Sequence, residues 1–185
     1  NEYRQAFEKG FLTLDMSHVD GHKDISSRKT GGSRSHVFAD LNLDLNDNSN
    51  FTVKVERVTN DEYFRTHDIN TSLVDSSETN LTNKINYSYN KNNTSLDISS
   101  IVYEDLRKTK DRYEFILPNV LFGKTFFTEK SGTFDLTSEA LYKNYDADKY
   151  QAMVTNQVIW NSDSKISKNG FVNTVEGIVK NINYQ

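Results

Sequence analysis

Hydrophobic and polar residues alternate along much of this chain. The clearest example runs from His36 to Leu45, where every second residue is apolar and only Phe38 interrupts the polar parity. The apolar parity consists of Val37, Ala39, Leu41, Leu43 and Leu45. Because successive side chains of a strand point to opposite faces, this pattern predicts a β-strand with one apolar and one polar face.

Rows of the same kind recur along the sequence and are separated by turn-forming residues. Apolar side chains share a parity around residues 12–16, 51–55, 81–89, 96–102, 134–142 and 150–160, whereas residues 171–184 are mixed. Clusters of Asn, Asp, Gly, Lys and Ser lie between the rows, as in residues 46–50 and 90–93. Such clusters favour tight turns, so neighbouring rows are predicted to form antiparallel hairpins.

The spacing of the turns predicts roughly eight to ten strands of about ten residues each, which is the length that crosses a membrane in a β-barrel. Strands of soluble proteins are shorter, usually about 5–6 residues. No stretch approaches the roughly 18 consecutive apolar residues that indicate a transmembrane helix. We therefore predict an all-β fold: a segment of an antiparallel transmembrane β-barrel whose meandering strands form an open, curved sheet.

Composition supports this choice over a soluble or a disordered chain. Only 35% of the 185 residues are hydrophobic and the mean hydropathy is -0.72. A soluble β-sandwich of this length normally has a higher apolar fraction from which to build its core. The 12% of aromatic residues and the sustained alternation argue against disorder. A membrane barrel needs only one apolar face. The net charge of -4, with scattered lysines and no basic stripe, makes nucleic acid an unfavourable partner.

The sequence contains no arrangement of residues that predicts catalysis or a bound cofactor. His18 and His22 have a metal-binding spacing only on a helix, and they fall at a strand end and its turn. Residues 146–148 lack the glycine and closing glutamate of a calcium loop, and no nucleophile elbow is present. The chain has no cysteine, which excludes thiolate metal sites within it. We predict no enzyme activity, no cofactor and no metal.

The two parities predict two surfaces of different character. If the apolar rows face lipid, the opposite face lines a hydrated lumen. The candidate lumen-facing residues are Asp40, Asn42, Asp44, Lys54, Glu56, Lys84, Asn86, Asp97, Asp135 and Glu139. The candidate lipid-facing residues are Val37, Leu41, Leu43, Phe51, Val53, Ile85, Tyr87, Leu96, Ile98, Val154 and Val158. A sheet with one face in ordinary solvent would show the same alternation and stays an alternative at this stage.

Several short motifs, in their order along the chain, resemble the LptD family of lipopolysaccharide-assembly proteins. They are Glu2-Tyr3-Arg4 with Phe7 and Gly10-Phe11-Leu12-Thr13-Leu14, then Ser35-His36-Val37-Phe38-Ala39, then Asp61-Glu62-Tyr63-Phe64-Arg65-Thr66-His67-Asp68-Ile69, then Ile116-Leu117-Pro118, and then Gly132-Thr133-Phe134-Asp135-Leu136. Each motif is short, and their common order carries the resemblance. The chain differs from the family pattern at residues 119–122 and in its long Asn-rich turns.

The resemblance implies a part in the last step of lipopolysaccharide export, in the outer membrane of a Gram-negative bacterium. Family members form a large barrel that is plugged by an LptE-type lipoprotein and receives lipopolysaccharide from a periplasmic Lpt bridge through a jellyroll domain. We expect residues 1–185 to be one internal part of such a barrel, without the jellyroll and the barrel's terminal strands. The expected partners are therefore lipopolysaccharide, the plug lipoprotein, the bridge and outer-membrane lipid.

Two other functions are compatible with the alternation. A porin-like outer-membrane barrel is one, although it would be expected to carry rows of constriction-forming arginines, which the sequence lacks. A soluble periplasmic β-sheet module that binds lipid is the other, and it would enclose a continuous apolar interior in a short, closed sheet.

Overall fold

The structure is a computed structural model, which describes residues 2–19, 34–59, 70–75, 77–108, 110–145 and 149–185. The described chain is built from strands. Ten of them form one sheet: β1 (Glu2–Phe7), β2 (Gly10–Val19), β3 (Arg34–Asn46), β4 (Ser49–Val58), β5 (Asn80–Lys91), β6 (Thr94–Asp105), β7 (Tyr113–Thr128), β8 (Gly132–Tyr145), β9 (Lys149–Asn161) and β12 (Glu176–Tyr184). A separate small hairpin pairs β10 (Lys165–Ile166) with β11 (Val172–Asn173).

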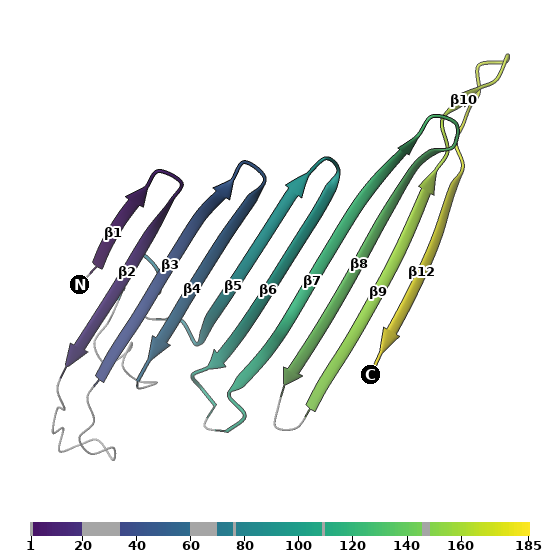
Figure 1. The fold of residues 1–185 in the computed structure, drawn as a ribbon. Coiled ribbons are helices and arrows are strands. Elements are labelled where there is room, and N and C mark those ends of the chain that lie inside the picture. The colour runs from purple at the N-terminus through teal and green to yellow at the C-terminus, as the bar shows by residue number, and fades with distance from the viewer. Residues whose placement is uncertain (1, 20–33, 60–69, 76, 109, 146–148) are drawn as a thin grey trace.

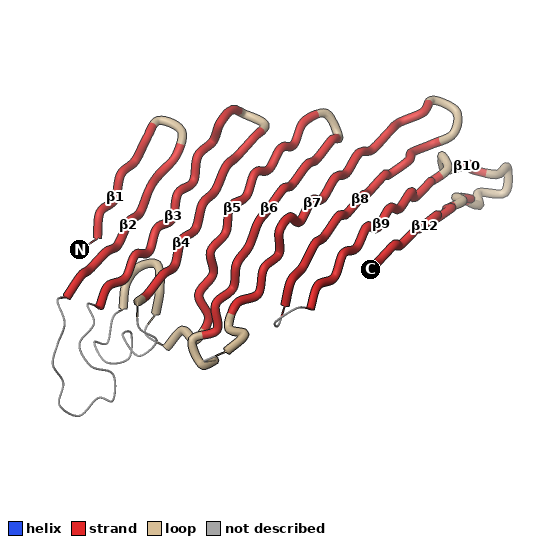
Figure 2. Tube along the Cα trace, turned by 60° about the horizontal axis from the view of Figure 1, so that its bottom comes forward, coloured by secondary structure: helices blue, strands red, loops and turns tan. Residues whose placement is uncertain are grey.

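The sheet is a meander in which strands that follow one another in the chain lie next to one another in space. All pairings are antiparallel, and the order runs β1 to β9 and then β12 (Figure 1). β1 and β12 form the two outer edges, so the sheet is open rather than closed on itself (Figure 2). The predicted all-β, antiparallel, open sheet is thereby confirmed, with a strand number inside the predicted range.

The two ends of the sheet differ in how they connect the strands. At one end, here named the turn end, β1–β2, β3–β4, β5–β6 and β7–β8 are joined by short turns (Figure 1). In the β5–β6 turn, Asn92 and Asn93 have φ angles of 48° and 59°, a left-handed conformation that asparagine tolerates better than most residues. The opposite end, named the loop end, carries the longer connections after β2, β4 and β6. Two connections depart from this division: β8 and β9 are separated by only three residues at the loop end, and the connection between β9 and β12, which contains the β10–β11 hairpin, lies at the turn end.

The register aligns residues of like character into rows that cross the sheet. One such row pairs Leu12 with Leu41, Leu41 with Val53, and Val53 with Ile85. Directly paired residues of an antiparallel sheet lie on the same face. The register therefore extends the alternation of each strand into two continuous surfaces.

A small hydrophobic cluster lies at the loop end. It contains the buried side chains of Phe38, Val58, Val74 and Leu81, with Leu73 and Leu106 packed against it. Val74 belongs to the connection between β4 and β5, so part of that connection folds back onto the sheet. Among the described residues this cluster contains every buried hydrophobic side chain, which is far less than a soluble domain of this length requires.

Candidate functional site on the polar face of the sheet

The ten candidate lumen-facing residues all lie on one face of the sheet. Asp40 pairs with Lys54, and Lys54 pairs with Lys84, which links β3, β4 and β5. Further along the sheet, Asp97 and Glu139 both pair with Leu121 of β7. The parity within each strand and the registers between strands place Asn42, Asp44, Glu56, Asn86 and Asp135 on the same face. We name this surface the polar face.

The eleven candidate lipid-facing residues lie together on the other face. Ile85 and Tyr87 pair with Val53 and Phe51 of the neighbouring strand. The registers place Val37, Leu41, Leu43, Leu96, Ile98, Val154 and Val158 on this same side. Nothing in the described chain covers this apolar face: Ile85 is 52% exposed and Val37 and Val154 are each 41% exposed. Each of the two residue sets predicted from parity therefore lies on a single face of the sheet.

At the loop end of the polar face, buried polar side chains bind one another. The ring of His36 lies within 3.0 Å of the Ser17 hydroxyl through Nδ1 and within 3.3 Å of an Asp15 carboxylate oxygen through Nε2. The same ring stacks on Phe38 with centroids 4.5 Å apart. These contacts join side chains of β2 to a side chain of β3. Because His36 is only 4% exposed, we interpret the cluster as a structural hydrogen-bond network rather than a reactive site.

Glu56 is the centre of a second network. Lys54 forms an ion pair with its carboxylate at 2.5 Å, and the backbone N–H of Thr82 donates to the same carboxylate at 2.6 Å. The β4–β5 ladder ends at the Lys54–Lys84 pair. Beyond it, the side-chain amide of Asn83 binds the backbone of Glu56 in place of a strand partner.

This irregularity corrects one expectation from parity. Leu81 shares its parity with Ile85, which predicts a position on the apolar face. It is instead fully buried in the cluster with Phe38 and Val58, which lie on the polar side of β3 and β4. Leu81 lies beyond the end of the β4–β5 ladder at Lys84, although β5 remains paired with β6 as far as Asn80.

The described part of the β4–β5 connection forms a strap across the polar face, defined here as residues 70–75. Val74 anchors it in the cluster beside Phe38, and the Ser72 hydroxyl donates to the Glu2 carboxylate of β1 at 3.0 Å. Within the strap, Thr71 and Val74 exchange backbone and side-chain hydrogen bonds. The strap explains why Phe38 interrupts the polar parity: it is the residue on which the strap packs.

The strap ends at Asp75, whose carboxylate accepts hydrogen bonds from Ser77. Hydrogen bonds from the side chain and backbone of Ser77 lower the pKa of Asp75 below its ordinary value. The Ser77 backbone N–H lies 2.7 Å from the Asp75 carboxylate. This local turn keeps Asp75 ionised where the chain leaves the strap.

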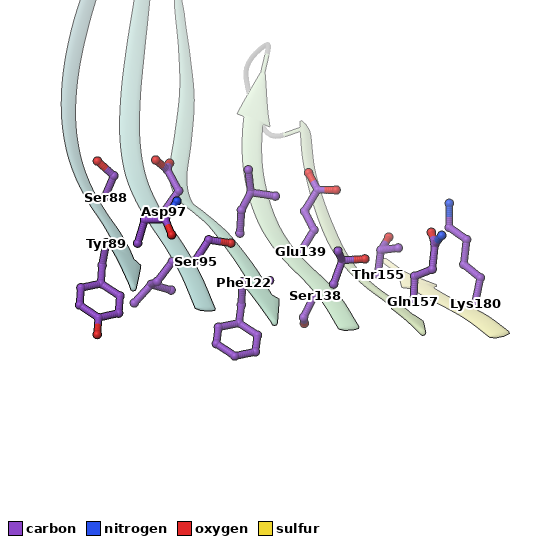
Figure 3. Close-up of a pocket in the computed structure, with 15 residues that line it drawn as sticks. Ser88, Tyr89, Ser95, Asp97, Phe122, Ser138, Glu139, Thr155, Gln157 and Lys180 are labelled. Atoms are coloured by element: carbon purple, nitrogen blue, oxygen red, sulfur yellow. The ribbon is translucent and has the colours of Figure 1, made fainter. Parts of the chain in front are cut away.

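Toward the turn end, the polar face forms a hollow of about 490 Å³ across β5 to β9 and β12. Figure 3 shows the side chains of Ser88, Asp97, Glu139, Thr155, Gln157 and Lys180 directed to one side of the sheet, and those of Tyr89, Phe122 and Ser138 directed to the other. Gly123 lies in its floor, and a Cβ atom there would approach the Ser95 hydroxyl to 2.6 Å. The sequence named Asp97 and Glu139 as candidates but missed the other members, because serine, threonine and glycine carry no distinctive signal in a chain so rich in polar residues.

The remaining candidates from the sequence are not assembled into a site. His18 lies near the end of β2, whereas His22 and residues 146–148 lie outside the described residues. No group of three or more His, Asp or Glu side chains in the described ranges is placed to hold a metal ion. The described residues also form no helix that is long and apolar enough to span a membrane.

Comparison with known proteins gives one family match. The family model described as LptD, LPS transport system D, matches residues 32–157. The match covers β3 to β8 and most of β9, and so includes both faces of the sheet and most of the hollow. No curated protein matches the chain.

Proposed function

The chain belongs to the LptD family of lipopolysaccharide transport proteins, and from this premise we propose that it forms part of the wall of an outer-membrane β-barrel through which lipopolysaccharide reaches the cell surface. In this proposal the apolar face meets membrane lipid and the polar face lines the lumen. The family is associated with the outer membrane of Gram-negative bacteria. Lipopolysaccharide is the transported substrate, which requires positioning and passage rather than a covalent reaction.

The observation that carries the proposal is the exposed apolar face, in which polar residues such as Ser138 and Asn156 are a minority and bind each other. Strands of 12 to 16 residues from β5 to β8 are long enough for a tilted strand to cross a bilayer. A soluble lipid-binding module would fold that face inward, yet Ile85, Ile98 and Val154 stay exposed. An exposed apolar surface of this extent is stable in lipid and is prone to aggregation in water.

The two ends of the sheet support an orientation. Outer-membrane barrels have short periplasmic turns and longer extracellular loops. We therefore place the turn end toward the periplasm and the loop end, with the strap, toward the cell exterior. An LptE-type plug and a periplasmic Lpt bridge remain proposed partners on the basis of family membership.

Depletion of the whole protein that contains this chain tests the proposal in its source bacterium. Newly made lipopolysaccharide should stop reaching the cell surface, as measured by pulse labelling and surface-specific detection, while the assembly of unrelated outer-membrane porins continues at first. Normal surface lipopolysaccharide combined with altered uptake of small solutes would instead identify a porin and contradict the proposal.

A further inference from the structure

The β10–β11 hairpin, taken here as residues 164–175, carries apolar side chains that nothing in the described chain covers. It projects beyond the ten-stranded sheet at the turn end (Figures 1 and 2). Ile166, Phe171 and Val172 are between 63% and 75% exposed, more than Ile85 on the apolar face. The hairpin also lies outside residues 32–157, which match the family model. An uncovered apolar surface on a projecting element indicates that another molecule or a membrane meets it.

The hairpin is held in shape by its own backbone hydrogen bonds. Ile166 pairs with Val172, so these two apolar side chains lie on the same face. At the tip, the Ser167 backbone N–H donates to the Phe171 carbonyl at 2.8 Å, and the Gly170 N–H donates to the Ser167 carbonyl at 3.0 Å. The apolar side chains are therefore presented together by a paired element.

The strands that carry the hairpin pass a row of aromatic side chains shortly before it. Phe126 pairs with Phe134, and Phe134 pairs with Trp160, all on the apolar face. The rings of Phe134 and Trp160 stack with centroids 6.4 Å apart, and the Lys124 ammonium lies 5.1 Å from the ring centroid of Phe126. Aromatic rings and lysines are typical of the level at which a membrane strand passes from hydrocarbon to head groups. We expect this row to lie at the membrane–water boundary of the turn end.

A break in strand pairing separates the hairpin from the sheet. The Ser162 N–H donates to the Val175 carbonyl at 2.8 Å, which continues the pairing of β9 with β12. Asp163, Ser164 and Thr174 then belong to neither ladder. A continuous ladder would carry the apolar tip into water, whereas the break permits the hairpin to bend toward the head groups.

The charges of the hairpin favour an anionic membrane surface. Lys165 and Lys168 are both exposed, and residues 164–175 include no acidic residue; Asp163 and Glu176 lie at the base. An anionic bilayer surface attracts lysines, and the boundary of its acyl chains accepts apolar side chains. Lysine is depleted from protein–protein interfaces, so this composition fits lipid better than a protein partner.

We propose that the β10–β11 hairpin docks on the anionic phospholipid surface of the membrane leaflet at the turn end. Ile166, Phe171 and Val172 enter the head-group region, and Lys165 and Lys168 bind lipid phosphates. This proposal rests on the function proposed above, which puts the chain in a membrane with its turn end toward the periplasm. It adds a membrane contact made outside the barrel wall.

The test uses the whole protein in vesicles of phosphatidylcholine and phosphatidylglycerol. An environment-sensitive fluorescent amino acid replaces Phe171, and phospholipids brominated on the upper part of the acyl chain quench it on contact. Strong quenching is expected. The same fluorescent amino acid at position 130 is the matched control, because Lys130 lies in the β7–β8 turn at the same end of the sheet, next to Glu129. It should remain in water and be quenched little.

Two double variants separate the apolar and the electrostatic contributions. Ile166→Thr with Val172→Thr retains the β-branched shape but removes apolar surface, and it should abolish most of the quenching at position 171. Lys165→Thr with Lys168→Thr should lower the ratio of lipid-bound to water-exposed hairpin roughly fivefold per lysine in the mixed vesicles. It should have no effect in phosphatidylcholine alone. Lys130→Thr should change neither result, and circular dichroism of each variant should show a folded β-protein.

Several outcomes would overturn the inference. They are equal quenching at positions 171 and 130, undiminished quenching in the Ile166→Thr, Val172→Thr variant, or capture of a protein rather than phospholipid by a photo-crosslinking amino acid at position 171 in the native membrane. If the probe at position 171 stays in water while depletion still blocks lipopolysaccharide export, the hairpin inference is wrong and the proposed function stands. If the probe is quenched while depletion leaves export intact, the membrane contact stands and the transport function is wrong.

Discussion

The side chain of Asn83 replaces a strand partner of Glu56. Its Oδ1 accepts the backbone N–H of Glu56 at 3.0 Å, and its Nδ2 donates to the backbone carbonyl of the same residue at 3.1 Å. One amide side chain therefore satisfies a donor and an acceptor at the point where the β4–β5 ladder has ended. The Glu56 carboxylate is held by Lys54 and by the Thr82 backbone, which further secures this junction.

Replacement of Asn83 by leucine should destabilise the protein by about 1–3 kcal/mol, because the Glu56 backbone loses both partners at a half-buried position. The free energy of unfolding in urea, measured in detergent micelles, gives this cost. Asn80→Leu is the matched control, since the Asn80 amide makes only a 3.4 Å contact with the Thr79 hydroxyl. Equal effects of the two substitutions would show that the Asn83 bonds contribute nothing.

Arginine substitutions on neighbouring residues of β3 distinguish the two faces. In a bilayer, Leu43→Arg should cost about 2–4 kcal/mol if Leu43 meets lipid near the membrane centre, whereas Asn42→Arg on the lumen side should cost far less. The measurement is the unfolding free energy of the whole protein in phospholipid vesicles. A larger cost for Asn42→Arg would reverse the proposed assignment of the faces.

The strap should detach when its anchor becomes charged. Val74 is 5% exposed and packs in the cluster with Phe38, so Val74→Asp would bury an unpaired carboxylate unless the strap leaves the sheet. Cross-linking of cysteines at positions 2 and 72 by a short bis-maleimide reports the position of the strap, since the side chains of Glu2 and Ser72 meet there. The cross-link should form readily in a Glu2→Cys, Ser72→Cys background and poorly once Val74→Asp is added.

The control for this experiment is Ser77→Ala, which removes a hydroxyl just beyond the strap and leaves the Val74 anchor intact. It should leave cross-linking unchanged. If Val74→Asp is cross-linked as readily as this control, the strap does not depend on its apolar anchor.

Alanine substitutions at Gly132 and Gly170 distinguish the cost of a left-handed backbone from the cost of a steric collision of the added Cβ atom. Gly132 and Gly170 have φ angles of 81° and 82°, and only at Gly132 would a Cβ atom collide, at 2.0 Å from the Asn161 carbonyl oxygen. Gly170→Ala should cost about 1–2 kcal/mol from the left-handed conformation alone, and Gly132→Ala should cost more. Thermal unfolding in micelles provides the comparison. Equal losses of stability would show that the β7–β8 turn adjusts freely.

The 185-residue chain produced by itself should aggregate in water or require detergent. Its edge strands β1 and β12 have unpaired backbone groups on their outer sides, and its apolar face is uncovered. Size-exclusion chromatography with and without detergent tests this expectation. A monodisperse water-soluble monomer would contradict both the open sheet and the membrane assignment.

Alternation along the chain was sufficient to assign most residues to a face of the sheet. The side-chain period of a strand is two residues, so the parity of Leu41, Val53 and Ile85 placed them on one side before any pairing was known. Composition also located most strand ends, because residues 46–50 and 90–93 contain the amides and acidic groups that favour turns. The prediction of a transport function came from the family resemblance, which includes residues 35–39 and 132–136. The family match covers both segments.

Which residues meet across strands became known only from the folded sheet. A slip of one residue would exchange the two faces and is opposed by the apolar pattern, but a slip of two residues preserves both faces and leaves parity unchanged. Parity therefore could not reveal that Asp97 and Glu139 share a row, or that Asn83 binds Glu56. The burial of Phe38 depended on Val74, a residue far along the chain in a connection without periodicity. These contacts are long-range, and local alternation contains no information about them.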